Sequence, residues 1–519
     1  MITITFEERA NDMVERRQLL KGLGGMGLGA VLAGCGVSTG DPTSAPKAPT
    51  FDFDLPDTGA KLPTAETTIR WLNGGPGPKT YFFNEFNAAY QKKHPNIKIQ
   101  YDELPNNKIA ETLPIQLRNG DVADAFLVID VPISELVAGK RLAALDDVIP
   151  NFGEWKKNVP FGTLVPGVQV FDGKTYAITP SSDRRSTLLL YNSDYMSKAG
   201  LDPAAKPFTW EEFRAAAKKL TEQGKGEYYG LILPQVFMGV VFDLAQLSGV
   251  RIADVRGDGI DWRTGEFNYH HDGIVALVEL LLAIKSDGSL FPGWAALKDE
   301  QARARMAQGG AGMILSGPWN FPVWKEQNPT FKYGVARLPG PDKGYIPYAV
   351  GGSNQFAVYA NATGDRKAIA GDQFHFLGTD QGQRAWNRLT GAADPAWSPQ
   401  AMKDVLGSSV IDEPNKAALK IFDQTVRLAP SPLVRNPANE KVELVFVAPK
   451  PNLGQVVQGI ITGQVTDARK ALKDLSDKSE KALNDAIAKA KSQGANVSRD
   501  DWKFANWDPS RDFAQADYK

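Results

Sequence analysis

The chain has 519 residues, of which 42% are hydrophobic, and 59 basic residues nearly balance 60 acidic ones. The net charge of −1 leaves no electrostatic footprint for nucleic acid or for an anionic membrane surface. A single core stops growing at about 250–300 residues, so we expect two large lobes or several domains.

Residues 1–35 have the layout of an export signal. Arg16-Arg17 precede a glycine-rich apolar run, 19–32, which is shorter than the roughly 20 residues that span a bilayer. Cys35 follows Leu32-Ala33-Gly34 and is the only cysteine, so we expect no disulfide and no cysteine metal site. The arginine pair resembles the twin-arginine export signal, and the end of the run resembles the bacterial lipobox. This resemblance implies cleavage before Cys35, lipidation of Cys35, and a membrane-anchored mature protein.

Two other interpretations of this stretch are disfavoured. A buried helix with a core cysteine would be weakened by the many glycines. The glycine pattern G-x-G-x-x-G at 22–27 lacks the preceding strand of a dinucleotide site, so we expect no cofactor. Residues 36–66, rich in Gly, Pro, Ser, Thr and Ala, predict a flexible tether.

Strand and helix patterns alternate over the next part of the chain. The patterns predict strands at 67–72, 97–101 and 125–129, and helices at 79–93, about 107–118, and in a short stretch ending at Gly139. This β-α-β-α-β order favours a doubly wound sheet. Because ligands of such sheets bind beyond the carboxyl ends of strands, the order singles out Asn73–Pro78 and Asp130.

The rest of the chain continues in the same style. Thr209 and Glu212 form a capping box, with Phe208 placed to contact Phe213, and predict a helix to about residue 222. Thr466 is the predicted cap of a long last helix. Further elements are predicted as strands at 174–179, 187–191, 229–233, 311–315, 345–350 and 356–359, as helices at 274–284, 302–308, 366–377, 381–389, 454–462 and 467–491, and as a tail, 498–519, on the surface of a lobe.

Several separate stretches together resemble the extracellular solute-binding proteins of carbohydrate ABC importers, the family that includes maltose-binding protein. The stretches keep the family's order and spacing across 67–469, and they are Gly120–Leu145, Gly173–Asn192, Lys206–Phe213, Gly312–Trp319 and Val350–Ala357. The resemblance does not extend to the last forty residues or so.

This resemblance implies a fold of two doubly wound α/β lobes of the type II periplasmic-binding-protein kind. A hinge joins the lobes, and a ligand cleft lies between them. We expect an N-terminal lobe of 67–180 and 345–395 and a C-terminal lobe of 181–344 and 396–519.

The strongest ligand-binding candidate is Trp319, which the resemblance places flat against a sugar ring. An aromatic face suits the C–H face of a sugar; the alternative is a core tryptophan. Asp130 follows a buried strand, at a position where the family places acidic residues that accept hydrogen bonds from sugar hydroxyls. The alternative is that Asp130 is a helix N-cap. Asn73 and Gly75 belong either to the site or to a plain turn.

The remaining candidates are charged, flexible or aromatic residues. Arg184 and Arg185 stand where relatives carry a ligand-facing side chain that is often acidic. They either recognise a ligand carboxylate or phosphate, or pair with Asp183 at the hinge. Gly351 and Gly352 let backbone amides approach a ligand or form a bulge. Phe237 and Trp397 are further aromatic candidates.

No metal or catalytic site is predicted. His270 and His271 would point to opposite faces of a strand, and the calcium-like stretch 254–261 has Arg256 where an oxygen ligand is needed. Among many carboxylates, none stands in a recognisable catalytic frame, and we expect no catalytic residue and no enzyme activity.

These observations favour one function over two alternatives. The favoured function is a monomeric, lipid-anchored extracytoplasmic protein that delivers a sugar or oligosaccharide to an ABC permease. The first alternative is the same fold binding an anionic or non-sugar solute, such as a glycerophosphodiester or sugar acid. The second is an exported carbohydrate-active enzyme. The sequence does not name the solute.

Overall fold

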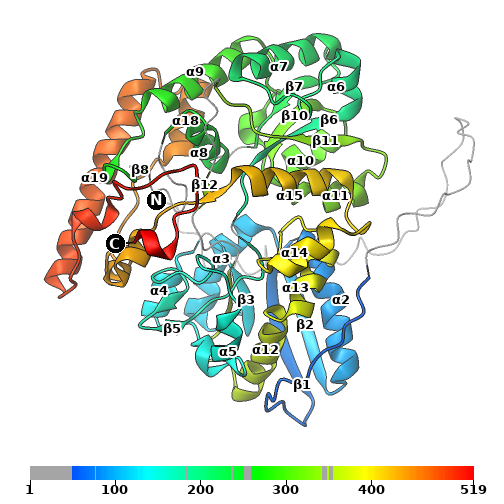
Figure 1. Cartoon of the computed structure of the whole chain (residues 1–519), viewed down its shortest axis with the longest axis vertical. Helices are drawn as coiled ribbons and strands as arrows, with labels where there is room; N and C mark the ends of the chain where they lie inside the picture. The colour runs from blue at the N-terminus through cyan, green and yellow to red at the C-terminus, as the bar shows by residue number, and fades with distance from the viewer. Residues whose placement is uncertain are drawn as a thin grey trace, which may run out of the picture. The chain divides into compact units, whose positions relative to one another are not determined.

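The computed structural model describes residues 50–75, 77–129, 131–182, 184–234, 238–250, 259–341, 348–349 and 355–518. All of them belong to one compact unit, Ala48–Lys519. Two separate four-stranded sheets organise this unit, and each is covered by helices (Figure 1). This confirms the predicted class of two α/β lobes.

The first sheet has the strand order β13-β3-β1-β2. Strands β1, β2 and β3 are parallel, and β13 runs antiparallel to β3. The elements of this lobe are β1 (Thr67–Gly74), α2 (Pro78–Lys93), β2 (Ile97–Leu104), α3 (Asn106–Asn119), β3 (Ala125–Val128), α4 (Ile133–Ala138), η1 (Leu145–Asp147), α5 (Phe152–Lys157), β4 (Val170–Phe171), β5 (Lys174–Thr175), β13 (Gln355–Val358), α12 (Gly364–Leu377), α13 (Asp380–Leu389) and α14 (Pro399–Leu406).

The core of this lobe is aromatic. Phe82 and Phe83 on α2 pack edge to face and lie against Trp386 of α13, and Trp71 of β1 donates its Nε1–H to Gln373 at 2.8 Å. Ala396 and Ala401 also belong to this core. The first lobe therefore extends beyond the expected boundary at 395, because α14 packs on α13.

The second sheet has the order β11-β6-β10-β7, in which β10 is parallel to β7 and antiparallel to β6. Its lobe contains β6 (Leu188–Asn192), α6 (Ser193–Ala199), α7 (Trp210–Gly224), β7 (Tyr229–Ile232), α8 (Met238–Gln246), β8 (Ile260–Asp261), β9 (Glu266–Phe267), α9 (Asp272–Ser286), η2 (Trp294–Ala296), α10 (Asp299–Ala307), β10 (Ala311–Ser316), α11 (Asn320–Gln327) and β11 (Tyr333–Ala336). The later elements are β12 (Tyr348–Ala349), α15 (Glu413–Thr425), β14 (Arg427–Leu428), α16 (Pro432–Arg435), η3 (Pro437–Asn439), α17 (Glu440–Glu443), α18 (Leu453–Thr462), α19 (Ala468–Ser492), η4 (Arg499–Trp502) and η5 (Gln515–Asp517).

Side-chain alternation along β6 divides this lobe into two buried layers. Leu188 and Leu190 face the helices α10, α11 and α15, whereas Leu189 faces the larger core that includes α7, α8 and α9. Successive residues of a strand point to opposite faces, so one short apolar strand fills both layers.

Several predicted caps are confirmed and others are corrected. Thr209 and Glu212 form the expected capping box of α7. The cap of α19 is Asp467 rather than Thr466, since the Asp467 carboxylate accepts from the Lys470 N–H at 2.9 Å. His271 does not lie on a strand: its Nδ1 caps α9 by accepting from the Gly273 N–H.

The C-terminal tail is part of the second core rather than a surface layer. Trp502, Phe504 and Trp507 are at most 2% exposed and belong to the same buried cluster as α18 and α19. Backbone contacts hold the chain that leaves the first lobe against that lobe. Ile178 bridges Phe356, and the Ser182 N–H donates to the Pro395 carbonyl at 2.7 Å.

The segment 50–62, part of the predicted tether, packs on the first lobe. Phe51, Phe53, Leu55 and Leu62 are partly buried against the first core, and the charged residues between the first three are exposed. The ring of Phe53 lies 5.8 Å from those of Phe86 and Phe376. The prediction of a flexible tether up to residue 66 is therefore wrong for this stretch, which we call the N-terminal strap.

Replacing Phe53 by Ala should lower the free energy of unfolding by about 1–3 kcal/mol, because the ring is partly buried between α2 and α12. Urea unfolding followed by tryptophan fluorescence measures the change. Asp52→Ala, at the exposed neighbour, is the matched control and should stay within about 0.5 kcal/mol of the unchanged protein. Equal stability of the two variants would show that the strap does not hold the lobe.

Candidate functional site

Polar side chains gather at the carboxyl ends of β1 and β2. Asn73, the penultimate residue of β1, is fully buried and donates from Nδ2 to the Tyr101 hydroxyl at 2.8 Å. Tyr101 donates in turn to the Glu103 carboxylate at 2.6 Å. Burial and the nearby Glu103 raise the pKa of Tyr101 far above its usual range, so the hydroxyl stays a donor. Oδ1 of Asn73 is buried and has no hydrogen-bond partner among the described residues.

Gly75 makes room for an acidic side chain. A Cβ at Gly75 would collide with the Glu103 carboxylate, which stands at the end of the neighbouring parallel strand. Glu103 is half-buried and carries two acceptor oxygens beside the loop that follows β1. Glu103 is not among the candidates selected from the sequence, although it lies near a strand end, the same feature that selected Asn73.

Trp319 is held by the loop between β10 and α11. A Cβ at Gly317 would collide with the Trp319 indole, so the ring folds back over the glycine. Asn320 fixes this loop by donating from Nδ2 to the Ser316 hydroxyl and the Gly317 carbonyl, both at 2.8 Å. Trp319 is half-buried and belongs to none of the buried clusters among the described residues. The Trp319 indole is therefore held in place by its loop and is not part of a buried core.

A hydrogen bond joins the elements that carry these residues in the two lobes. Tyr81 on α2 donates its hydroxyl to Glu326 on α11, the helix that begins directly after Trp319. Burial first, and then the Glu326 carboxylate, raise the pKa of Tyr81 above its usual range. The Tyr81–Glu326 hydrogen bond thus joins α2, the helix that follows β1, to α11, the helix that follows the Trp319 loop.

A buried charge cluster lies at the start of α2. Asp394 is 2% exposed and accepts from Lys79 Nζ at 2.9 Å and from the Arg185 guanidinium. Burial alone would raise the pKa of Asp394, yet the charges of Lys79 and Arg185 outweigh it and lower the pKa to about 2. Arg185 comes from the first crossing segment, so this cluster ties the crossing to the first lobe.

Two other sequence candidates have their polar groups engaged within the protein. Arg184 is ion-paired with Asp512 at 2.6 Å, and the same carboxylate accepts from the Leu428 N–H. Trp397 is 7% exposed, donates its Nε1–H to the Thr179 carbonyl at 3.0 Å, and lies edge-on to Trp155. An indole has one N–H, so Trp397 has no donor left for a ligand.

The structure thus brings Asn73 and Gly75 together with Glu103, and it links their lobe to α11 beside Trp319. Asp130, Phe237, Gly351, Gly352 and Cys35 lie outside the described residues, so their predicted roles stay predictions. No group of three or more His, Cys, Asp or Glu side chains within the described ranges could hold a metal ion. Among the same residues, no helix has the length and apolar character needed to cross a membrane.

Comparison with known proteins gives a consistent result. A family model described as bacterial extracellular solute-binding protein matches residues 85–401. A Brucella abortus protein described as a binding protein is 27% identical over 287 residues, which cover 54% of this chain and 65% of that protein.

Two solved structures share the fold. One is an ABC substrate-binding protein of Listeria monocytogenes in complex with cycloalternan, with a TM-score of 0.58, 20% identity, and coverage of 81% of this chain and 99% of that one. The other is the maltotriose-binding protein of Thermus thermophilus bound with maltotriose, with a TM-score of 0.57, 19% identity, and coverage of 80% and 100%.

Replacing Asp394 by Asn should destabilise the protein by about 3–5 kcal/mol at neutral pH, because the poorly exposed Lys79 loses its buried counter-ion and Arg185 loses one ion-pair partner. The folded pKa of about 2 lies below the unfolded value of about 3.9. The stabilisation is therefore complete above about pH 4 and is lost as the pH falls toward 2. Unfolding in urea at several pH values should show the gap between the two proteins narrowing over that range.

The matched control is Asp121→Asn, which removes the partner of Arg70 in an ion pair where the Asp121 side chain is 79% exposed. Its cost should stay below about 1 kcal/mol. If Asp394→Asn cost no more than this control, the buried cluster would not be a major source of stability.

Proposed function

Because the chain belongs to the family of bacterial extracellular solute-binding proteins, we propose that it captures a sugar or oligosaccharide and delivers it, as a monomer, to an ABC permease. The solute would lie between the lobes, and closure of the lobes would commit it to transport. The fold neighbours that carry cycloalternan and maltotriose support a saccharide as the solute class.

The observation that carries this proposal is the pairing of an aromatic face with hydroxyl acceptors. Trp319 stands beside the start of α11, and the Tyr81–Glu326 bond links this helix to the lobe that holds Asn73 and Glu103. A pyranose has apolar C–H faces and a polar rim of hydroxyls, so stacking on Trp319 and hydrogen bonds to carboxylate and amide oxygens match it. Asp130, Phe237, Gly351 and Gly352 are proposed to complete the site.

The anionic alternative loses the residues that suggested it. Arg184 is paired with Asp512, and Arg185 contributes to the buried cluster around Asp394. Freeing Arg184 for a ligand would remove the ion-pair partner of Asp512, and freeing Arg185 would remove one of the two cations that balance the buried Asp394. A neutral saccharide is therefore the favoured solute at the Trp319 site.

We further propose that a lipid on Cys35 holds the protein at the extracytoplasmic face of the membrane. The strap at 50–62 packs on the first lobe, so the tether predicted from the sequence shortens to residues 36–49, which lie outside the described residues. Fourteen residues of flexible chain have a root-mean-square span of about 20 Å. A linker of this length would keep the lobes within reach of a membrane-embedded permease.

Oligosaccharides screened by thermal shift should stabilise the protein saturably, by roughly 2.7 kcal/mol at a hundred times the dissociation constant. Trp319→Ala should weaken binding of the best saccharide at least tenfold, while Trp319→Tyr, which retains an aromatic face, should lose less. Isothermal titration measures both. The proposal fails if chromatography detects products of the saccharide, or if Trp319→Ala binds as tightly as the unchanged protein.

Replacing Cys35 by Ala should move the protein from the membrane to the soluble fraction, because the variant has no thiol to carry the proposed lipid. Immunoblotting of fractionated cells that produce the full chain tests this. Replacing Arg16-Arg17 by Lys-Lys in the same assay should block export if the twin-arginine route is used. A Cys35→Ala protein that stays on the membrane would contradict lipid anchoring.

A further inference from the structure

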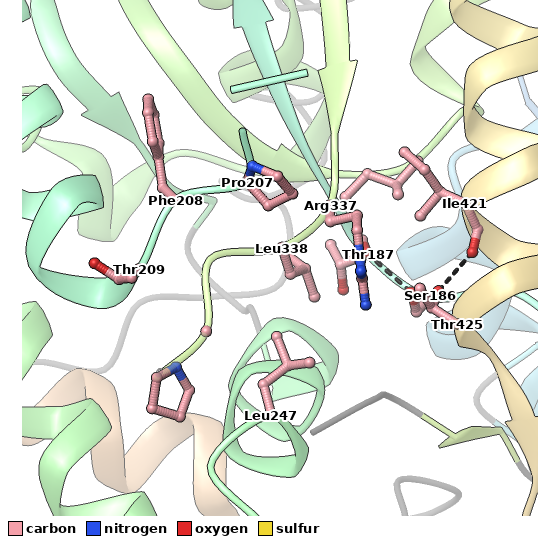
Figure 2. A pocket seen from close by; sticks show the side chains of 13 residues that line it. Ser186, Thr187, Pro207, Phe208, Thr209, Leu247, Arg337, Leu338, Ile421 and Thr425 are labelled. Atoms are coloured by element: carbon pink, nitrogen blue, oxygen red, sulfur yellow. Dashed lines mark hydrogen bonds between the residues drawn. The ribbon is translucent and has the colours of Figure 1, made fainter. Parts of the chain in front are cut away.

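Arg337 lines a cavity of about 240 Å³ in the second lobe and lies directly after β11. Figure 2 shows its side chain among residues from four other parts of the chain: the start of β6, the loop before α7, the end of α8, and α15. The cavity is smaller than the roughly 300–1,000 Å³ of sites for drug-sized molecules, so its occupant must be small.

None of the described residues that line the cavity balances the charge of Arg337. The lining contains no acidic residue, and Arg337 forms no hydrogen bond or ion pair with any residue that the structure describes. The neighbouring carboxylate of Asp243 is engaged by Thr187, through its N–H at 2.7 Å and its hydroxyl. A half-buried guanidinium without a counter-ion has lost hydration without compensation, which favours an external anion.

The hydroxyl groups of the lining add a second type of contact. Ser186 donates to the Thr187 carbonyl at 3.0 Å, and Thr425 donates to the Ile421 carbonyl at 2.6 Å. These bonds use the hydroxyl protons and leave the oxygen lone pairs as acceptors. Apolar side chains, among them Leu247 and Leu338, form other parts of the wall. The cavity thus offers one cationic fork and acceptors for O–H groups.

The register of the sheet places this cavity on the same edge as the Trp319 loop. Ala336 of β11 pairs with Leu189 of β6, so the next residue, Arg337, lies opposite Leu188. On its other side, Leu188 pairs with Ser316 at the end of β10. Strands are about 4.8 Å apart, which puts Arg337 roughly 10 Å along the edge from β10. The lining also includes the first residues after the crossing segment that carries Arg185, namely Ser186, Thr187 and Leu188.

We propose that the Arg337 cavity binds a small oxyanion, with the guanidinium as its fork-shaped donor, at a place separate from the Trp319 site. The oxyanion is either a free anion or the acidic group of a small hydroxylated solute, and the chemistry of recognition is the same. Because the cavity wall includes the end of the first crossing segment, the bound anion would favour the arrangement of the lobes in which that segment lies beside Arg337.

The test is a titration of the protein with inorganic phosphate, followed by thermal shift and calorimetry at constant ionic strength set with sodium chloride. Phosphate should raise the melting temperature saturably. Arg337→Gln should weaken phosphate binding at least tenfold, and Arg337→Lys should retain part of it, since a lysine keeps the charge without the fork. Arg305→Gln is the matched control: it removes an exposed guanidinium whose hydrogen-bond partner among the described side chains is Gln308, and it should leave binding unchanged.

Two further measurements make the result decisive. Without phosphate, Arg337→Gln should melt at or above the temperature of the unchanged protein, because it removes an unbalanced charge. Glycerol 3-phosphate binding at least tenfold tighter than phosphate would identify the anion as part of a solute; equal affinity would identify a free anion. The Trp319→Ala variant should still bind phosphate, so the phosphate titration tests this proposal even if the protein binds no saccharide.

The proposal is overturned if phosphate has no effect beyond that of chloride at matched ionic strength. It is also overturned if Arg337→Gln binds phosphate like the unchanged protein, or if this substitution lowers the melting temperature in chloride alone. The last result would show that Arg337 is a structural group.

Discussion

The interaction on which the two-lobed architecture depends most is the pair of buried ion pairs that Asp394 forms with Lys79 and Arg185. Lys79 lies in the first turn of α2, where a positive charge opposes the helix dipole, and that turn has no acidic residue of its own. Asp394 supplies the missing negative charge from the loop after α13. Arg185 brings the first crossing segment to the same carboxylate. One buried anion thus holds a helix start, a loop and an interlobe connection in place.

The placement of arginines separates structural from functional charge in this protein. Arg184 and Arg185 are adjacent in sequence and alike in chemistry, yet one is paired at the surface with the C-terminal tail and the other in the interior of the first lobe. Arg337 lies in a cavity whose lining has no carboxylate. What a guanidinium can bind is decided by which carboxylates lie near it, and this is why only the unpaired one is assigned to an external anion.

The N-terminal strap determines which lobe the proposed lipid anchor would be attached to. Phe51, Phe53 and Leu55 alternate with Asp52 and Asp54, and this period of two lets an extended chain bury one side on the first lobe. Thr58 donates to Asp372, which also accepts from Tyr90 at 2.7 Å. Near its carboxyl end the strap is thus held by a buried hydrogen-bonded network. A pull on the proposed lipid linker would therefore act on the first lobe and not on the hinge.

The sequence by itself determined the local elements and the fold class. The apolar periods of α2, α9 and β6, the Thr209–Glu212 capping box, and the order of strands and helices are properties of neighbouring residues. Asn73, Gly75 and Trp319 could be selected because strand ends and following loops are visible in the chain. Only the tertiary structure decided the partners of the charges, because Arg185 and Asp394, and Tyr81 and Glu326, are more than two hundred residues apart. The tertiary structure also decided that residues 50–62, which have the composition of a tether, pack on the first lobe as a strap. The sequence alone does not show whether a phenylalanine such as Phe53 is buried, because the surface that covers it comes from distant parts of the chain.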